Sequence, residues 1–135
     1  MYIFGGYVGC EPTDTFFKYD FNFRMWRIVS SIKYLLEARP CPRAGHSALA
    51  VKDHMYLFGG KTAAKHKLND LWKFHFRFDF WERISLKDNG PQPGIRSGHS
   101  CSFYQDYLII FGGIRKVLKE TNDCWAFNLN TKIWT

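Results

Sequence analysis

The stretch PRAGHSALAVKDHMYLFGG, residues 42–60, returns as IRSGHSCSFYQDYLIIFGG at residues 95–113. Both stretches keep the same order: an arginine, a Gly-His-Ser triplet, an apolar run and a closing Phe-Gly-Gly. The match extends without a gap from residues 40–82 to residues 93–135, a period of about 53 residues. Periods of this length are typical of solenoids, propellers and other repeat arrays, so this repeat decides the fold class.

A third, incomplete copy opens the chain. Residues 1–6 align with residues 55–60, and both segments end in Phe-Gly-Gly. After a loop of different length, an aromatic stretch that ends at Trp26 aligns with the one that ends at Trp81. The segment that would match the start of the repeat is missing before Met1. The first copy is therefore expected to lack its first strand.

Each copy predicts four short strands. In the middle copy they are residues 46–51, 55–60, 70–76 and 80–85, all rich in β-branched and aromatic side chains. Lys52 and Asp53 form a tight turn between the first two. Short runs of this kind predict an antiparallel meander. Four strands per repeat at this period are typical of a propeller blade.

The composition agrees with a packed β protein. Hydrophobic residues make up 46% of the 135 residues and aromatic residues 19%, which is ample for a core and argues against disorder. Thirteen Phe, seven Tyr and five Trp favour strands over helices. No apolar run has the length needed to cross a bilayer, and the first residues do not form a secretory signal. We expect no membrane partner.

The pattern P-x-P-R-x-G-H-S, then F-G-G, then N-D-L-W and a later tryptophan resembles the kelch repeat. The residues of this pattern are most similar to the repeats of the leucine-zipper-like and Rab-effector-type kelch proteins. The resemblance implies an all-β, kelch-type β-propeller with about two and a half four-stranded antiparallel blades in an incomplete ring. Residues 1–39 would form a partial blade (strands two to four) and a link, residues 40–92 a complete blade, and residues 93–135 a nearly complete blade cut at its fourth strand.

Kelch propellers usually close with roughly five to seven blades, so two explanations of the short chain stay open. The chain is a fragment of a longer protein, or it closes a ring by assembling with other chains. In both cases the chain alone exposes apolar blade faces and an unpaired strand edge. We therefore expect it to oligomerise, to aggregate or to stay partly unfolded.

The four cysteines, at positions 10, 41, 101 and 124, contain no C-x-x-C pair. A zinc site would use closely spaced ligands, and a disulfide framework would be denser in a secreted chain of this size. Reduced thiols in an intracellular protein, cytoplasmic or nuclear, are the interpretation we adopt. His46 and His99 occupy equivalent repeat positions, which indicates structural roles. The sequence predicts no metal site and no other cofactor.

The chain carries no G-x-S-x-G, P-loop or dinucleotide motif. The main hypothesis is therefore a non-catalytic protein–protein interaction module with a scaffold or substrate-adaptor role. The alternative is a fragment of a kelch/galactose-oxidase-like enzyme whose active site lies in blades not present here. The net charge of +7 raises the question of nucleic acid, but the aromatic residues needed for stacking occupy repeat positions and are expected to be buried. We expect no nucleic-acid partner.

Meander geometry brings the start of strand one, the end of strand two and the start of strand three to one rim. Loops on a rigid scaffold usually carry the binding residues. The residues expected to contact a protein or peptide partner are Tyr7, Arg43, Lys61, Lys65, Lys67, Arg96, Ser97, Arg115, Lys116 and Lys119. The excess of cations favours an acidic partner, with an ordinary solvated loop as the alternative. A second alternative is that Arg43 and Arg96 pair internally with Asp70 and Asp123.

Overall fold

The second of three main sheets is a complete four-stranded antiparallel meander, in the order β6-β7-β8-β9. The computed structural model describes residues 1–29, 39–86, 90–116 and 119–135. The strands of this sheet are β6 (Ser47–Val51), β7 (His54–Lys61), β8 (Lys67–His75) and β9 (Phe80–Arg83). Val51 pairs with His54 across the predicted tight turn, where Lys52 adopts a φ of 53°.

The sheets on either side repeat this plan with three strands each. The first contains β1 (Tyr2–Phe4), β4 (Phe16–Asp20) and β5 (Met25–Ile28), in that order. The third contains β10 (Ser100–Tyr104), β11 (Tyr107–Phe111) and β14 (Cys124–Asn128), and Trp134 adds an isolated bridge to Phe127. The expected link after the first sheet falls mostly at residues 30–38, outside the described residues.

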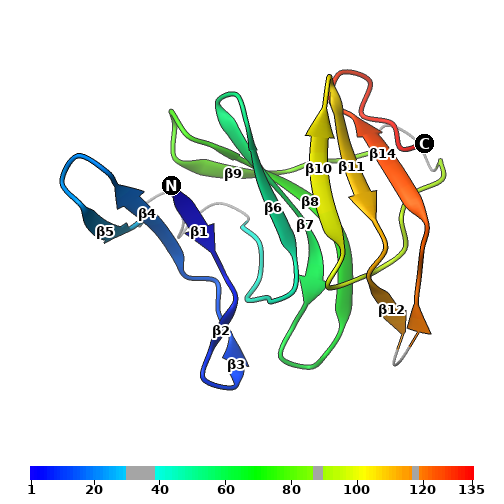
Figure 1. Ribbon diagram of the computed structural model, residues 1–135, viewed down its shortest axis with the longest axis horizontal. Helices are drawn as coiled ribbons and strands as arrows, with labels where there is room; N and C mark the ends of the chain where they lie inside the picture. Colours follow the sequence, from blue (N-terminus) through cyan, green and yellow to red (C-terminus); the bar gives the residue numbers. More distant parts are fainter. Residues whose placement is uncertain (30–38, 87–89, 117–118) are drawn as a thin grey trace.

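The three sheets stand face to face in chain order, as the blades of a propeller do (Figure 1). Every strand pair in the structure is antiparallel. The described ranges contain no helix, and therefore none that could span a membrane. The architecture confirms the prediction of an all-β, partial propeller.

Two short ribbons extend the first and third sheets at one end. One pairs β2 (Tyr7–Val8) with β3 (Glu11–Pro12), and the other pairs β12 (Ile114–Lys116) with β13 (Lys119–Glu120). In the second sheet the same position is held by the loop between β7 and β8. All three lie at the lower end of Figure 1.

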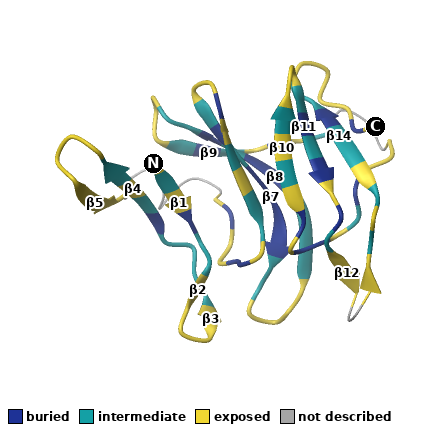
Figure 2. Cartoon of the chain, in the orientation of Figure 1, coloured by how far each residue is buried: buried dark blue, intermediate teal, exposed yellow. Residues whose placement is uncertain are grey.

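The core consists of two apolar layers, one in each interface between sheets. Phe4 and Phe16 of the first sheet pack against Leu57, Phe74 and Trp81 of the second. The other face of the second sheet packs in the same way against the third, where Leu108, Ile110, Phe127 and Trp134 are buried. Figure 2 shows the buried residues in dark blue along the strands of the three sheets. The middle blade thus buries both of its faces, one against each neighbour.

The Phe-Gly-Gly segments explain how closely two blades approach. Gly59 has a φ of 63° and lies at an irregularity of β7, where the register shifts between Phe58 and Gly60. A Cβ added at Gly59 would lie 2.9 Å from the carbonyl oxygen of Arg96, so only glycine admits the next blade's backbone. The tryptophan of the next blade's fourth strand packs on the phenylalanine before these glycines, and the Phe58 and Trp134 rings lie 5.5 Å apart.

The outer faces of the first and third sheets are open to solvent. Trp26 and Ile28 on β5 are 48% and 63% exposed, and Phe111 on β11 is 51% exposed. All of β5 is exposed in Figure 2. In the middle sheet, the residues equivalent to Trp26 and Phe111 are Trp81 and Phe58, which pack against the neighbouring sheets.

We expect the 135-residue chain to self-associate at micromolar concentration, because large exposed apolar faces rarely persist on a soluble monomer. Size-exclusion chromatography with light scattering measures the mass. Replacing Trp26, Ile28 and Phe111 by serine should shift the mass toward the monomer. Phe78, 58% exposed in the turn before β9, is the matched control. A monodisperse monomer at every concentration would show that the open faces do not drive association.

Candidate functional site

The candidate site is a rim formed by three neighbouring loops: the β2–β3 ribbon, residues 61–67 and the β12–β13 ribbon. Isolated backbone bridges join each segment before a first strand to the loop of its own blade. Ala44 pairs with Lys61, and Ser97 pairs with Ile114. The start of strand one and the end of strand two therefore lie together, as the meander predicted.

Contacts between different blades connect the loops of this rim. The Lys61 Nζ lies 5.8 Å from the centre of the Tyr7 ring, a cation–π contact between the second and first blades. The Lys67 Nζ donates a hydrogen bond of 3.2 Å to the backbone oxygen of Lys116 in the third blade. The structure thus brings Tyr7 to Lys61, and Lys67 to Lys116.

The remaining rim cations point to solvent. Lys65, Arg115, Lys116 and Lys119 are all exposed. A hollow of about 240 Å³ is lined by Ile95 together with the last three of these cations. No ion pair within the described ranges involves a cation of these loops. The described rim loops therefore present several exposed cations without an ion-pair partner, beside the exposed carboxylates of Glu11 and Glu120.

Arg43 and Arg96 lie beneath the rim and do not form part of its surface. Their side chains are 1% and 0% exposed. Ser97 is also buried. Of the two roles considered for the arginines, direct contact with a partner is therefore wrong for this structure, and internal pairing is the one observed.

Each arginine makes a bidentate ion pair with the aspartate of its own blade. Arg43 Nη1 and Nη2 donate to the two carboxylate oxygens of Asp70 at 2.6 and 2.8 Å. Nη1 also donates to the carbonyl oxygen of Gly59 at 3.1 Å. Arg96 repeats this arrangement with Asp123, at 2.8 and 2.7 Å. The two pairs hold the segment that precedes the first strand of each blade against the second and third strands, beneath the rim loops.

The environment keeps both carboxylates ionised. Burial opposes ionisation of Asp70, but hydrogen bonds from Arg43 and Trp72 outweigh it, so the pKa of Asp70 lies below its usual value. Hydrogen bonding by Arg96 is the main reason why the pKa of Asp123 is also lowered. Each pair is therefore a permanent charge pair at neutral pH.

The aspartate of the Asn-Asp dipeptide also accepts a hydrogen bond from a tryptophan of its own blade. Asn69 and Asp70 lie inside β8, which begins at Lys67. The indole Nε1 of Trp72 donates to Asp70 Oδ2 at 2.6 Å, and Trp125 does the same to Asp123. The spacing D-x-W was the available signal, because residues i and i+2 of a strand share one face.

His46 and His99 lie in the interfaces between blades. The His99 ring packs edge-on against Phe58 at 5.3 Å, and its Nε2 is 2.8 Å from Ser47 Oγ. Burial, followed by the charge of the nearby arginine, lowers the pKa of each histidine to about 4. Both are therefore neutral at pH 7, which suits a packing role.

The described part of the chain brings together no group of three or more His, Cys, Asp or Glu side chains that could hold a metal ion. Its four cysteines are free thiols.

Comparison with known proteins matches all of residues 1–135 to the family described as the KLHDC2/KLHL20/DRC7 Kelch-repeats domain. The chain is 33% identical to the Rho GTPase-activating protein gacHH of Dictyostelium discoideum, over 98% of the chain and 9% of that protein. It is 28% identical to the leucine-zipper-like transcriptional regulator 1 homolog of Drosophila melanogaster, over 97% of the chain and 14% of that protein.

The chain is also 27% identical to the human kelch domain-containing protein 3, and the match covers all of this chain and 37% of that protein. It thus spans well under half the length of each of these relatives.

Replacing Asp70 by asparagine is expected to lower the free energy of unfolding by about 3–5 kcal/mol, because it leaves the buried Arg43 charge without a counter-ion. Asp14→Asn is the matched control. Asp14 pairs at 2.8 Å with Arg39, whose side chain is 48% exposed, and its loss should cost less than about 1 kcal/mol. Urea unfolding at submicromolar protein concentration measures both. Equal costs for the two variants would contradict the argument.

Stability is also expected to fall as the pH is lowered from 6.5 to about 4. The folded pKa of His46 and His99, about 4, lies below the ordinary histidine value of 6.5, so in this window the unfolded chain binds more protons than the folded chain. Each histidine adds up to about 1.4 kcal/mol per pH unit in this window. Above pH 6.5 the contribution is complete. Urea unfolding across pH 4–8 tests this, and the double variant His46→Gln, His99→Gln should show a clearly smaller slope. An unchanged slope would assign the effect to other groups.

Proposed function

The chain belongs to the kelch-repeat family, and on that premise we propose that it is a non-catalytic protein-interaction module that binds its partner through the rim loops. The observation that carries the proposal is the contrast between the two parts of each blade. Repeated residues are buried in the interfaces between blades, whereas the loops that differ from blade to blade are exposed at one rim. A rigid scaffold with varied loops is well suited to recognition.

An acidic protein segment is the partner that this rim fits best. Exposed cations of the second and third blades, Lys65, Arg115, Lys116 and Lys119, lie on adjacent loops joined by the Lys67–Lys116 hydrogen bond. Tyr7 is 53% exposed beside Lys61 and adds an aromatic surface. Carboxylates would meet several cations at once, and such complementarity raises both specificity and the rate of association.

The names of the relatives favour a scaffold or adaptor role for this segment. The matched proteins are named for different activities, among them a GTPase-activating protein, a transcriptional regulator and an F-box/kelch-repeat protein. The part in common with this chain is the kelch region, a minor share of each. We therefore assign to the chain a scaffold or substrate-adaptor role in which other segments supply the activity.

Reversing the charge of four rim residues should abolish binding of an acidic peptide. The variant carries glutamate at Lys65, Lys67, Arg115 and Lys119, and the probe is a fluorescein-labelled octaglutamate peptide followed by fluorescence anisotropy. Binding to the unaltered chain should weaken as salt rises from about 50 to about 300 mM, because exposed charges are screened over a Debye length of roughly 10 Å.

The matched control reverses four exposed cations at the opposite end of the blades: Arg24, Lys52, Arg77 and Lys132. Both variants change the net charge equally, so a difference between them locates the site. Exposed loop substitutions each change stability by only about 0.5 kcal/mol, so both should fold. Equal weakening by the two variants would reduce the interaction to net charge and refute a site at the rim.

A further inference from the structure

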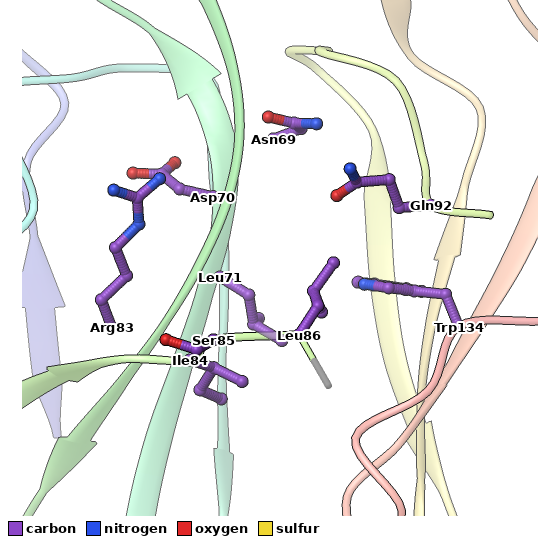
Figure 3. A pocket seen from close by; sticks show the side chains of 9 residues that line it. All are labelled: Asn69, Asp70, Leu71, Arg83, Ile84, Ser85, Leu86, Gln92 and Trp134. Carbon is purple, nitrogen blue, oxygen red and sulfur yellow. The ribbon is translucent and has the colours of Figure 1, made fainter. Parts of the chain in front are cut away.

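Figure 3 shows a hollow of about 390 Å³ beside β8 and the segment after β9. The polar groups that β8 contributes to it are already engaged within the fold. Both oxygens of Asp70 accept hydrogen bonds from Arg43, and Arg83 lies beside this carboxylate. The Asn69 amide donates to the backbone oxygen of Pro93 at 3.3 Å. A different cluster of the second sheet, built on two histidines, has nitrogen atoms that can bind a ligand.

Two histidines and a glutamate form a chain of hydrogen bonds at the end of the second sheet opposite the rim. His54 begins β7 and His75 ends β8, and the two lie directly opposite each other in the strand register. His54 Nε2 is 3.0 Å from His75 Nδ1, and His75 Nε2 is 3.0 Å from Oε2 of Glu82 on β9. The Phe80 ring stacks on the His75 ring at 4.1 Å, which limits rotation of this imidazole. This end of the sheet is the upper one in Figure 1.

Glu82 determines which nitrogen of the neutral His75 ring carries the proton. A carboxylate only accepts hydrogen bonds, so the proton is on Nε2 and the lone pair of Nδ1 points toward His54. Burial, followed by the charges of His75 and Lys73, lowers the pKa of His54, so this ring is also neutral at pH 7. A single proton, on His54 Nε2, therefore lies between the two facing nitrogens.

The histidine pair is not part of the repeat. Asp20 and Asn128 occupy the position of His75 in the first and third sheets. In each, the side-chain Oδ1 accepts hydrogen bonds from the backbone amides two and three residues further on, which caps the turn. Tyr107 pairs with Asn128 where His54 pairs with His75. The middle blade thus has a histidine pair in place of this turn cap, which favours a role other than the packing that the copies share.

The separation of the two facing nitrogens suits a divalent transition-metal ion. Two nitrogens that each lie about 2.0–2.1 Å from one tetrahedral zinc ion are roughly 3.3 Å apart, slightly more than the 3.0 Å observed here. Histidines that bind a metal typically donate their other ring proton to a carboxylate, as His75 does to Glu82. The same Glu82 oxygen accepts from Lys73 at 2.9 Å, and this nearby positive charge is expected to keep the affinity moderate.

We propose that His54 Nε2 and His75 Nδ1 bind a divalent transition-metal ion such as zinc, in an open site whose remaining positions are taken by water. The ion replaces the proton between the rings, and that proton moves to Nδ1 of His54, so both histidines stay neutral. Glu82 orients His75 without contacting the ion. The sequence predicted no metal site, because these histidines are 21 residues apart and only the pairing of β7 with β8 brings them together. The site lies away from the rim and does not depend on the function proposed for it.

An NMR titration with zinc chloride at pH 7 tests the site through the ring signals of the individual histidines. The signals of His54 and His75 should shift together and saturate at micromolar zinc, whereas those of the buried His46 and His99 should not move. Because each histidine reports separately, zinc bound by the free thiols is distinguished from zinc at this site. Magnesium should leave all of the rings unchanged, because it prefers oxygen ligands.

The variant His75→Asn removes one ligand and keeps the fold, since asparagine caps the equivalent turn of the third blade at Asn128. His54 should then no longer respond to zinc. Glu82→Gln should weaken binding by about 10–100-fold, because it removes the carboxylate that orients His75. His66→Ala, at an exposed histidine between β7 and β8, is the matched control and should change nothing.

Thermal melts followed by circular dichroism check that each variant folds. The proposal is overturned if His54 and His75 do not respond up to millimolar zinc, if His54 responds equally in the His75→Asn variant, or if His66→Ala alone removes the response.

Discussion

The buried ion pair between an arginine and an aspartate of the same blade is the interaction on which the rest of the structure depends. Arg43 reaches Asp70 with its side chain, while its carbonyl oxygen accepts a hydrogen bond of 2.9 Å from the Gly6 amide of the first blade. Arg96 repeats both contacts, and its carbonyl oxygen accepts from Gly60. One residue thus connects strands within a blade and backbone between blades. Because the guanidinium is buried, neither partner can be lost without a large cost.

This constraint links the fold to the rim. The arginine segment enters each blade immediately beside the end of the second strand, and the bridges Ala44–Lys61 and Ser97–Ile114 continue from it. The rim loops therefore leave the blades from positions that the buried pairs hold fixed. A loop anchored in this way loses less conformational freedom when a partner binds, which favours affinity.

The sequence predicted the blades well because their signals are local: alternating apolar residues, turn residues and a repeat that registers the copies. It could not decide the direction of Arg43 and Arg96, because their burial is created by the neighbouring blade. The same reason applies to Ser97 and to the aromatic contact of Tyr7 with Lys61, which both depend on how two blades meet. Alternation along the third strand places Asp70 and Trp72 on one face, but the hydrogen bond between them depends on side-chain orientations that the sequence does not show.

The two interfaces between blades agree at the residues that hold the packing and differ at the residues along their edges. Positions that carry the same residue in successive copies, such as Arg43 and Arg96, hold the packing of one blade on the next. Positions that differ change the contacts at the edge of the interface: Asp14 and Arg39 form an ion pair of 2.8 Å, whereas Asn69, at the position of Asp14, donates to the Pro93 carbonyl oxygen. Because the buried pairs keep the backbone fixed in both places, such substitutions alter the chemistry of a gap without altering the blade that contains it.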